Sequence, residues 1–187
     1  MAIQATQHTR PLTYEDLLAT PDDHQRYEII QGEMFVSHSP ATAHQHLVYR
    51  LIQTVGDFVD DRGLGLVIPG PVDVRLGMHT IVAPDLVFVR AERVGIVRKQ
   101  LIEGPPDLVV EVASPSTRKR DIIQKAAIYA EAGVREYWLP DPETRVFRML
   151  VLREGVFHDV DPVDGAFHST VIDGVAIDPT TLFAGID

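Results

Sequence analysis

The hydrophobic pattern of the chain is clearest in two short apolar runs, each of which carries an acidic residue. One run, Ala83-Pro-Asp-Leu-Val-Phe-Val89, has Asp85 at its start, and the other, within residues 106–115, has Glu111 in its middle. Short runs rich in β-branched residues and bounded by prolines predict strands that are buried on both faces. A carboxylate in such a strand is costly unless it is paired, hydrogen-bonded or bound to a metal. Both acids are therefore candidates for chemistry.

Helical periodicity is strongest from about residue 43 to residue 61, where apolar residues recur at spacings of three and four and predict an amphipathic helix. A second helix is predicted over 118–132, capped by Ser116 or Thr117 and ended by Gly133. This second helix carries Lys125.

Two local motifs predict the beginning of the fold. Thr13 and Asp16 resemble a capping box that opens a short helix, and residues 27–36 predict a hairpin around Gly32. Further strands are predicted at 66–68, 72–76, 136–139, 146–152, 156–157 and 171–177, followed by a partial turn at 180–183.

The order of these elements predicts an α/β fold with a mixed sheet flanked by helices. The strand at 107–112, the helix at 118–132 and the strand at 136–139 form a unit whose strands should be parallel, with a right-handed crossover. We expect one domain over residues 1–187, with residues 1–10 as a loose tail.

Composition narrows the class of protein. The 187 residues are 45% hydrophobic and 24% charged, as in ordinary globular domains, and the absence of cysteine excludes disulfides and thiolate metal sites. No apolar run is long enough to span a membrane and no signal peptide is visible, so we expect a cytoplasmic protein without a membrane partner. The net charge of −10 argues against a non-specific nucleic-acid binder, because the basic patch is confined to Arg118-Lys-Arg120 with its neighbours.

The two strand carboxylates suit a hard divalent cation, Mg²⁺ or Mn²⁺. If their strands are neighbours, Asp85 and Glu111 can converge on one ion, with the backbone carbonyl of Val112 as a third ligand. A helix that follows the Glu111 strand must run back along it, so Lys125 can point at the Glu111 carboxylate. A lysine there can orient an attacking water or neutralise charge on a phosphate transition state.

Structural roles explain the same residues without catalysis. Asp85 could be a strand-entry turn residue, Glu111 could pair with Arg118 or Arg120, and Lys125 could form an exposed pair with Asp121.

Three other residues also have two interpretations. His44 either contacts a phosphate and orients a ligand or bonds the Ser37–Pro40 loop. Glu28 either joins the acidic site or faces solvent, with Glu33 as an alternative acid. Tyr129 is favoured as a core aromatic over a base-stacking platform.

Several segments together resemble the Uma family of restriction-endonuclease-like domains, over residues 13–158. The similar segments are Tyr27-Glu-Ile-Ile-Gln-Gly-Glu33, Ser39-Pro40 followed by His44, Ala83-Pro-Asp-Leu86, residues 105–117, Asp121 to Lys125, and residues 129–142. The resemblance implies the PD-(D/E)xK phosphodiesterase fold, a metal-binding pair at Asp85 and Glu111, and Glu28 as a further acid. Ala113 stands where the wider fold usually carries its catalytic lysine, and Lys125 occupies the position that takes over this role.

Two hypotheses of different class follow. The first is an Mg²⁺- or Mn²⁺-dependent DNA endonuclease, acting as a homodimer because two sites suit the two strands of a duplex. The second is a catalytically silent dimeric binding or regulatory module on the same fold. For the first we expect the acidic residues to repel one another without metal, and Lys125→Met to leave folding nearly intact.

Overall fold

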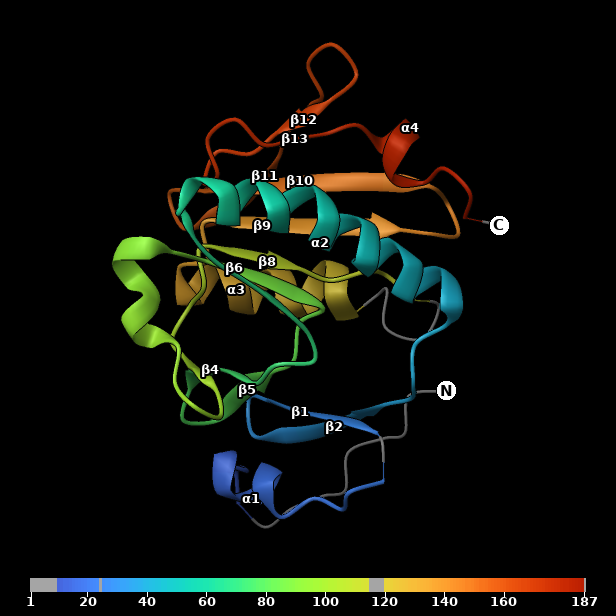
Figure 1. The fold of residues 1–187 in the computed structure, drawn as a ribbon. Helices are drawn as coiled ribbons and strands as arrows, with labels where there is room; N and C mark the ends of the chain where they lie inside the picture. Colours follow the sequence, from blue (N-terminus) through green and yellow to red (C-terminus); the bar gives the residue numbers. More distant parts are fainter. Residues whose placement is uncertain (1–9, 24, 115–119, 187) are drawn as a thin grey trace.

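The computed structural model describes residues 10–23, 25–114 and 120–186, which form two main sheets, one above the other in Figure 1. The lower sheet has the strand order β2-β1-β5-β4-β7, and the upper one the order β11-β10-β9-β8-β6-β3. The lower sheet contains β1 (Arg26–Ile30), β2 (Glu33–Ser37), β4 (Val74–Gly77), β5 (Thr80–Val82) and β7 (Ile102–Glu103). The upper sheet contains β3 (Gly65–Pro69), β6 (Leu86–Arg90), β8 (Leu108–Val110), β9 (Glu136–Asp141), β10 (Val146–Arg153) and β11 (Val156–Asp159).

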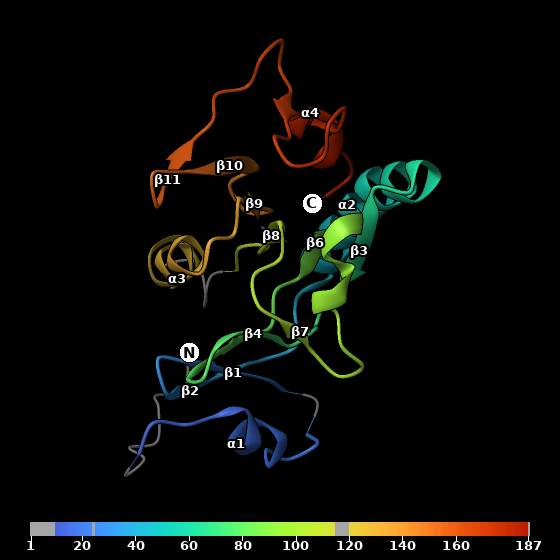
Figure 2. The same ribbon diagram turned by 90° about the vertical axis from the view of Figure 1, so that its left-hand side faces the viewer.

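Helices lie on both faces of the upper sheet, below the lower sheet and beside the edge strand β3. They are α1 (Tyr14–Leu18), α2 (Thr42–Arg62), the 3₁₀-helix η1 (Ala91–Ile96), the π-helical segment η2 (Arg120–Lys125), α3 (Ala126–Ala132) and α4 (Pro179–Leu182). Figures 1 and 2 show α2 and α3 on opposite faces of the upper sheet, and α1 below the lower sheet. None of the helices in the described residues is both long and apolar enough to cross a membrane.

The two-sided burial of β6 and β8 explains their uninterrupted apolar sequences. Phe88 and Leu108 pack in a cluster with residues of α2, whereas Val87 and Val109 pack with Tyr129 of α3. Successive side chains of a strand point to opposite faces, so each strand contributes to both layers. The prediction of strands buried on both faces is confirmed.

Strand pairing places the two acidic segments next to each other. β6 pairs antiparallel with β8, with Leu86 opposite Val110, and β8 pairs parallel with β9, with Val110 opposite Trp138. The α/β fold class, with a mixed sheet flanked by helices, is therefore confirmed, as is the parallel pairing across the predicted strand–helix–strand unit.

The local sequence motifs correctly predicted α1 and the hairpin of β1 and β2. The backbone N–H of Thr13 donates to the Asp16 carboxylate at 2.8 Å, as a capping box requires. The hairpin turns through Gln31 and Gly32, both with positive φ, and a Cβ at Gly32 would lie 2.7 Å from Pro11 Cβ. Glycine is therefore required at this turn for both its backbone conformation and its small size.

One strand prediction is wrong. Of the segment 171–177, only β13 (Ala176–Ile177) is a strand, paired with β12 (Phe167–His168). The hydroxyl of Ser169 accepts the N–H groups of Val171 and Ile172, so residues 171–175 form turns and bends. Their apolar side chains are nevertheless buried against α2. The apolar run reflects burial and does not indicate strand pairing.

Some predictions concern the undescribed residues. The caps Ser116 and Thr117 and the start of the 118–132 helix lie outside the described residues, as does most of the predicted tail. Within that tail Arg10 is described, and its guanidinium bonds both carboxylate oxygens of Asp16 at 2.8 and 2.7 Å.

Candidate active site

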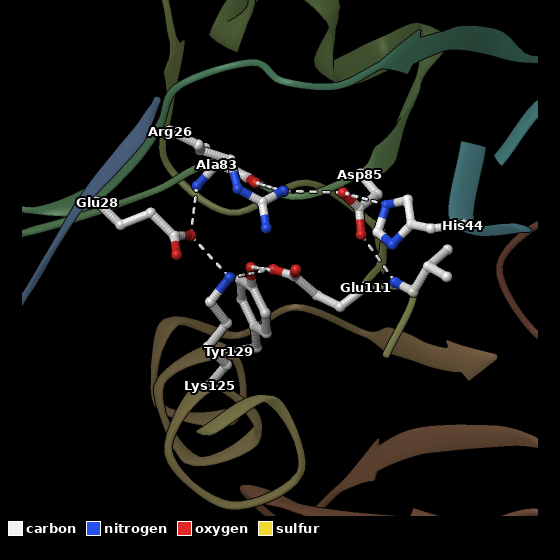
Figure 3. Close-up of polar contacts among 9 residues, drawn as sticks. Arg26, Glu28, His44, Ala83, Asp85, Glu111, Lys125 and Tyr129 are labelled. Carbon is white, nitrogen blue, oxygen red and sulfur yellow. Dashed lines mark hydrogen bonds and ion pairs between the residues drawn. The ribbon is translucent and has the colours of Figure 1, made fainter. Parts of the chain in front are cut away.

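The candidate site lies where the chain passes from one sheet to the other (Figure 3). β5 of the lower sheet ends at Val82 and β6 of the upper sheet begins at Leu86, so Asp85 stands in the junction. Glu28 reaches the same place from β1, and Glu111 follows directly after β8. The sheet topology thus brings together three acids that are far apart in sequence.

Asp85 is held by contacts to both of its carboxylate oxygens. Oδ1 accepts a hydrogen bond from Arg26 Nη1 at 2.8 Å and lies 3.2 Å from His44 Nε2. Oδ2 accepts the backbone N–H of Val112 at 2.8 Å. Burial by itself would raise the pKa of Asp85, but His44 and Arg26 outweigh it and hold the pKa below its ordinary value. Asp85 is therefore an ionised, oriented carboxylate.

Lys125 joins the other two acids. Its Nζ lies 2.7 Å from Glu28 Oε1 and 2.8 Å from Glu111 Oε1, and its side chain is 0% exposed. Glu28 Oε1 also accepts the backbone N–H of Ala83 at 2.9 Å. The ammonium is thus enclosed between two buried carboxylates.

Tyr129 completes the environment of Glu111. Its hydroxyl donates to Glu111 Oε1 at 2.6 Å. Complete burial, followed by the charge of Glu111, raises the pKa of Tyr129 well above its ordinary value of about 10. The phenol therefore stays protonated and remains a donor. Tyr129 is the predicted core aromatic, and it also fixes the carboxylate.

The helix geometry explains how Lys125 and Tyr129 both donate to Glu111 Oε1. Lys125 is the last residue of η2, and Tyr129 lies four residues later in α3, so both side chains lie on one helix face. π-helical turns are rare in proteins, and those that occur are often found at functional sites. Here the π-helical segment ends at the lysine of the site.

Arg26 also belongs to the site, although the sequence analysis did not identify it as a candidate. Besides Asp85, its Nη1 contacts the carbonyl oxygen of Ala83 at 3.2 Å, and its side chain is 22% exposed. A signal was present, because Arg26 lies two residues before Glu28 and alternate residues of a strand share a face.

The structure contradicts two of the structural alternatives. Lys125 is not in an exposed pair, and Glu28 does not face solvent, since both side chains are fully buried. The alternative acid Glu33 lies exposed at the hairpin. A pair between Glu111 and Arg118 or Arg120 involves side chains outside the described residues.

His44 sits in the first turn of α2 and contacts Asp85, so it orients this carboxylate. Val112 reaches Asp85 through its N–H, and its carbonyl as a metal ligand stays a prediction.

The expectations about stability need revision, because they treated the acids as mutually repelling. Arg26 and Lys125 lie among the three acids, at 2.7–2.8 Å from their oxygens. Removing Lys125 would leave Glu28 and Glu111 buried without this cation. The expectation that Lys125→Met leaves folding nearly intact assumed a lysine stem on the helix surface, and the burial contradicts that assumption.

The donor chemistry of Asp85 and Glu111 fits a hard divalent ion, since both offer carboxylate oxygens. In the present arrangement, the described residues contain no group of three or more acidic, histidine or cysteine side chains placed to hold a metal. Arg26, His44 and Val112 engage the oxygens of Asp85, and Lys125 and Tyr129 engage Glu111 Oε1. An ion at these carboxylates would therefore compete with the protein's own donors.

A pocket of about 670 Å³ opens beside Asp85. Arg26 and His44 line it together with Asp85, and the loop at 37–41 forms part of its wall. Glu111 and Lys125 are not among its lining residues, so from this pocket Asp85 and Arg26 are reached first.

A mixed sheet flanked by helices, with carboxylates at the ends of two adjacent strands, is the arrangement expected of the restriction-endonuclease-like class. Residues 13–170 match the model of the Uma2 family, described as "Putative restriction endonuclease", and the chain belongs to this family. The predicted family resemblance is confirmed.

The structure is also similar to a crystal structure described as "a putative nuclease belonging to DUF820 from Anabaena variabilis". The TM-score is 0.77 at 16% sequence identity, with 92% of this chain and 98% of that chain covered. The comparison with curated proteins gives no match. Family membership supports a nuclease, and the structural match shows the shared fold.

Proposed function

We propose that the protein is an Mg²⁺- or Mn²⁺-dependent endonuclease that hydrolyses DNA phosphodiester bonds at Asp85 and Glu111. The observation that carries this proposal is the convergence of Asp85, Glu111 and Glu28 around two cations beside an open pocket. Buried carboxylates are costly, so three of them gathered beside a pocket support a chemical role in addition to their bonds to the backbone.

Each residue then has a defined task. A bound divalent ion would act as a Lewis acid and lower the pKa of a coordinated water. Asp85 and Glu111 would hold it, with His44 and the Val112 N–H fixing the orientation of Asp85. The Lys125 ammonium lies beside the Glu111 carboxylate, where it can stabilise negative charge that develops on the phosphate.

The pocket offers a route for a phosphodiester despite the net charge of −10. The first turn of α2, which lies at the pocket, contains no acidic residue, and Arg26 and His44 face the same space. Asp73 and Asp85 also line the pocket, so Arg26 supplies the positive charge that a phosphodiester would meet there. We also propose a homodimer, because cleavage of both strands of a duplex suits two such sites.

A specific observation favours the second hypothesis, a silent binding or regulatory module. Hydrogen bonds and ion pairs within the protein already engage both oxygens of Asp85, so this carboxylate is oriented without an ion. The two hypotheses differ in whether divalent metal produces cleavage.

The test measures cleavage of plasmid and single-stranded DNA, with Mn²⁺ and with EDTA, by identically prepared wild type, Asp85→Asn and Glu103→Gln. Glu103 pairs with Arg75 on the surface of β7 and serves as the control. We expect Mn²⁺-dependent cleavage by wild type and the control, and a loss of roughly 10²-fold or more in Asp85→Asn. Equal activity in all three would indicate a contaminant, and no activity in any would support the silent module.

A further inference from the structure

Arg26 occupies a central position among the carboxylates. Figure 3 shows its side chain between Glu28 and Asp85, with Glu111 on the side nearer α3. Burial would lower the pKa of Arg26, but the charges of Asp85, Glu28 and Glu111 together raise it above its ordinary value. The guanidinium is therefore permanently charged and interacts with every acid of the site.

The contacts of Asp85 differ in how readily they can be exchanged. The Val112 N–H belongs to backbone that continues β8, and His44 is 6% exposed within α2. Arg26 instead has a long side chain that is 22% exposed and lines the pocket. His44 also lines the pocket, but its side chain is shorter and almost fully buried, so Arg26 is the partner of Asp85 that exchanges most readily.

Lys125 does not have this freedom. Its side chain is 0% exposed, and its Nζ is held by Glu28 and Glu111. A cation that entered from the pocket would meet Asp85 and Arg26 before it met Lys125. The exchangeable cation of the site is therefore Arg26.

We propose that Arg26 is the resident counter-ion of Asp85 and that it moves into the adjoining pocket when a divalent cation binds, where its guanidinium contacts a DNA phosphate. This inference rests on the proposed function. A guanidinium and a metal ion compete for the same carboxylate oxygen, and a displaced guanidinium is well suited to a phosphate because its paired N–H groups match two phosphate oxygens.

The first test is a calorimetric titration of Mg²⁺ into wild type, Arg26→Gln, Arg26→Lys and the surface control Arg75→Gln. Removing a competitor should tighten Mg²⁺ binding by roughly tenfold or more in Arg26→Gln, while the control stays at the wild-type value. Arg26→Lys keeps the charge and should stay near wild type. If Arg26 only supports the structure of the site, Arg26→Gln would bind Mg²⁺ equally or more weakly, which would overturn the proposal.

The second test uses the unaltered protein and therefore does not depend on the folding of a variant. The side-chain ¹⁵N–¹H signal of Arg26, identified by its loss in Arg26→Lys, is followed by nuclear magnetic resonance in EDTA and in saturating Mg²⁺. We expect the signal to move towards that of an exposed arginine and to exchange faster with water.

The outcomes separate this proposal from the proposed function. Mg²⁺ binding by wild type with an unchanged Arg26 signal would overturn the counter-ion role and leave the metal site standing. No Mg²⁺ binding by wild type would overturn the metal site and this proposal together.

Discussion

Lys125→Met tests the burial of the ion-pair cluster most severely. The lysine Nζ lies within 2.8 Å of both Glu28 and Glu111, and no part of its side chain is exposed. Methionine keeps the volume and the helix propensity but removes the charge, so two buried carboxylates lose their shared cation. Removing one partner of a buried pair costs about 3–5 kcal/mol. For a chain of this size, that corresponds to a fall in melting temperature of roughly 6–20 °C.

The assay is a thermal melt at pH 7 in EDTA, compared with Lys99→Met. Lys99 is exposed, and its substitution should change the free energy of unfolding by no more than about 0.5 kcal/mol. The double variant Glu28→Gln with Lys125→Met should recover part of the loss, because one carboxylate is then neutral. A melting temperature of Lys125→Met within about 2 °C of wild type would refute the burial of this charge.

Two further predictions concern neighbouring groups. Asp85 has a lowered pKa when folded, so it contributes stability above its ordinary value of 3.8, and this stability is lost as the pH falls through the lower folded value. Acid titrations followed by circular dichroism should therefore show a steeper loss of stability below about pH 4 in wild type than in Asp85→Asn. Tyr129→Phe removes the donor to Glu111 and should lower the free energy of unfolding by about 1–3 kcal/mol in a urea melt at pH 7. An unchanged midpoint would mean that water replaces the phenol at Glu111.

The fold was largely predictable because hydrophobic periodicity reports burial directly. The apolar face of α2 and the uninterrupted runs at β6 and β8 each gave the correct element. The error at residues 171–175 has the same origin, since these apolar side chains are buried in turns that hydrogen-bond to Ser169. Hydrophobic periodicity identifies buried positions, but it does not show which hydrogen bonds the backbone N–H and C=O groups make at these positions.

The local pattern predicted site residues only where a charge interrupts an apolar run, whereas Glu28 and His44 were assigned through the family resemblance. Glu111 stood out in an apolar strand, and Lys125 followed in the next helix. Glu28 and Arg26 did not stand out, because alternating polar residues on β1 are equally typical of a solvent-facing strand. Their burial depends on the second sheet packing against the first, which is a tertiary contact that local sequence does not encode.

Anomalous diffraction from crystals grown with Mn²⁺ tests most directly whether Asp85, just before β6, and Glu111, just after β8, hold a divalent ion. We predict a manganese peak beside Asp85 and Glu111, with Arg26 no longer bonded to Asp85. The same experiment on Asp85→Asn should show no peak. Saturating Mn²⁺ with no peak at these residues, and with the ion pair between Arg26 and Asp85 intact, would contradict the claim.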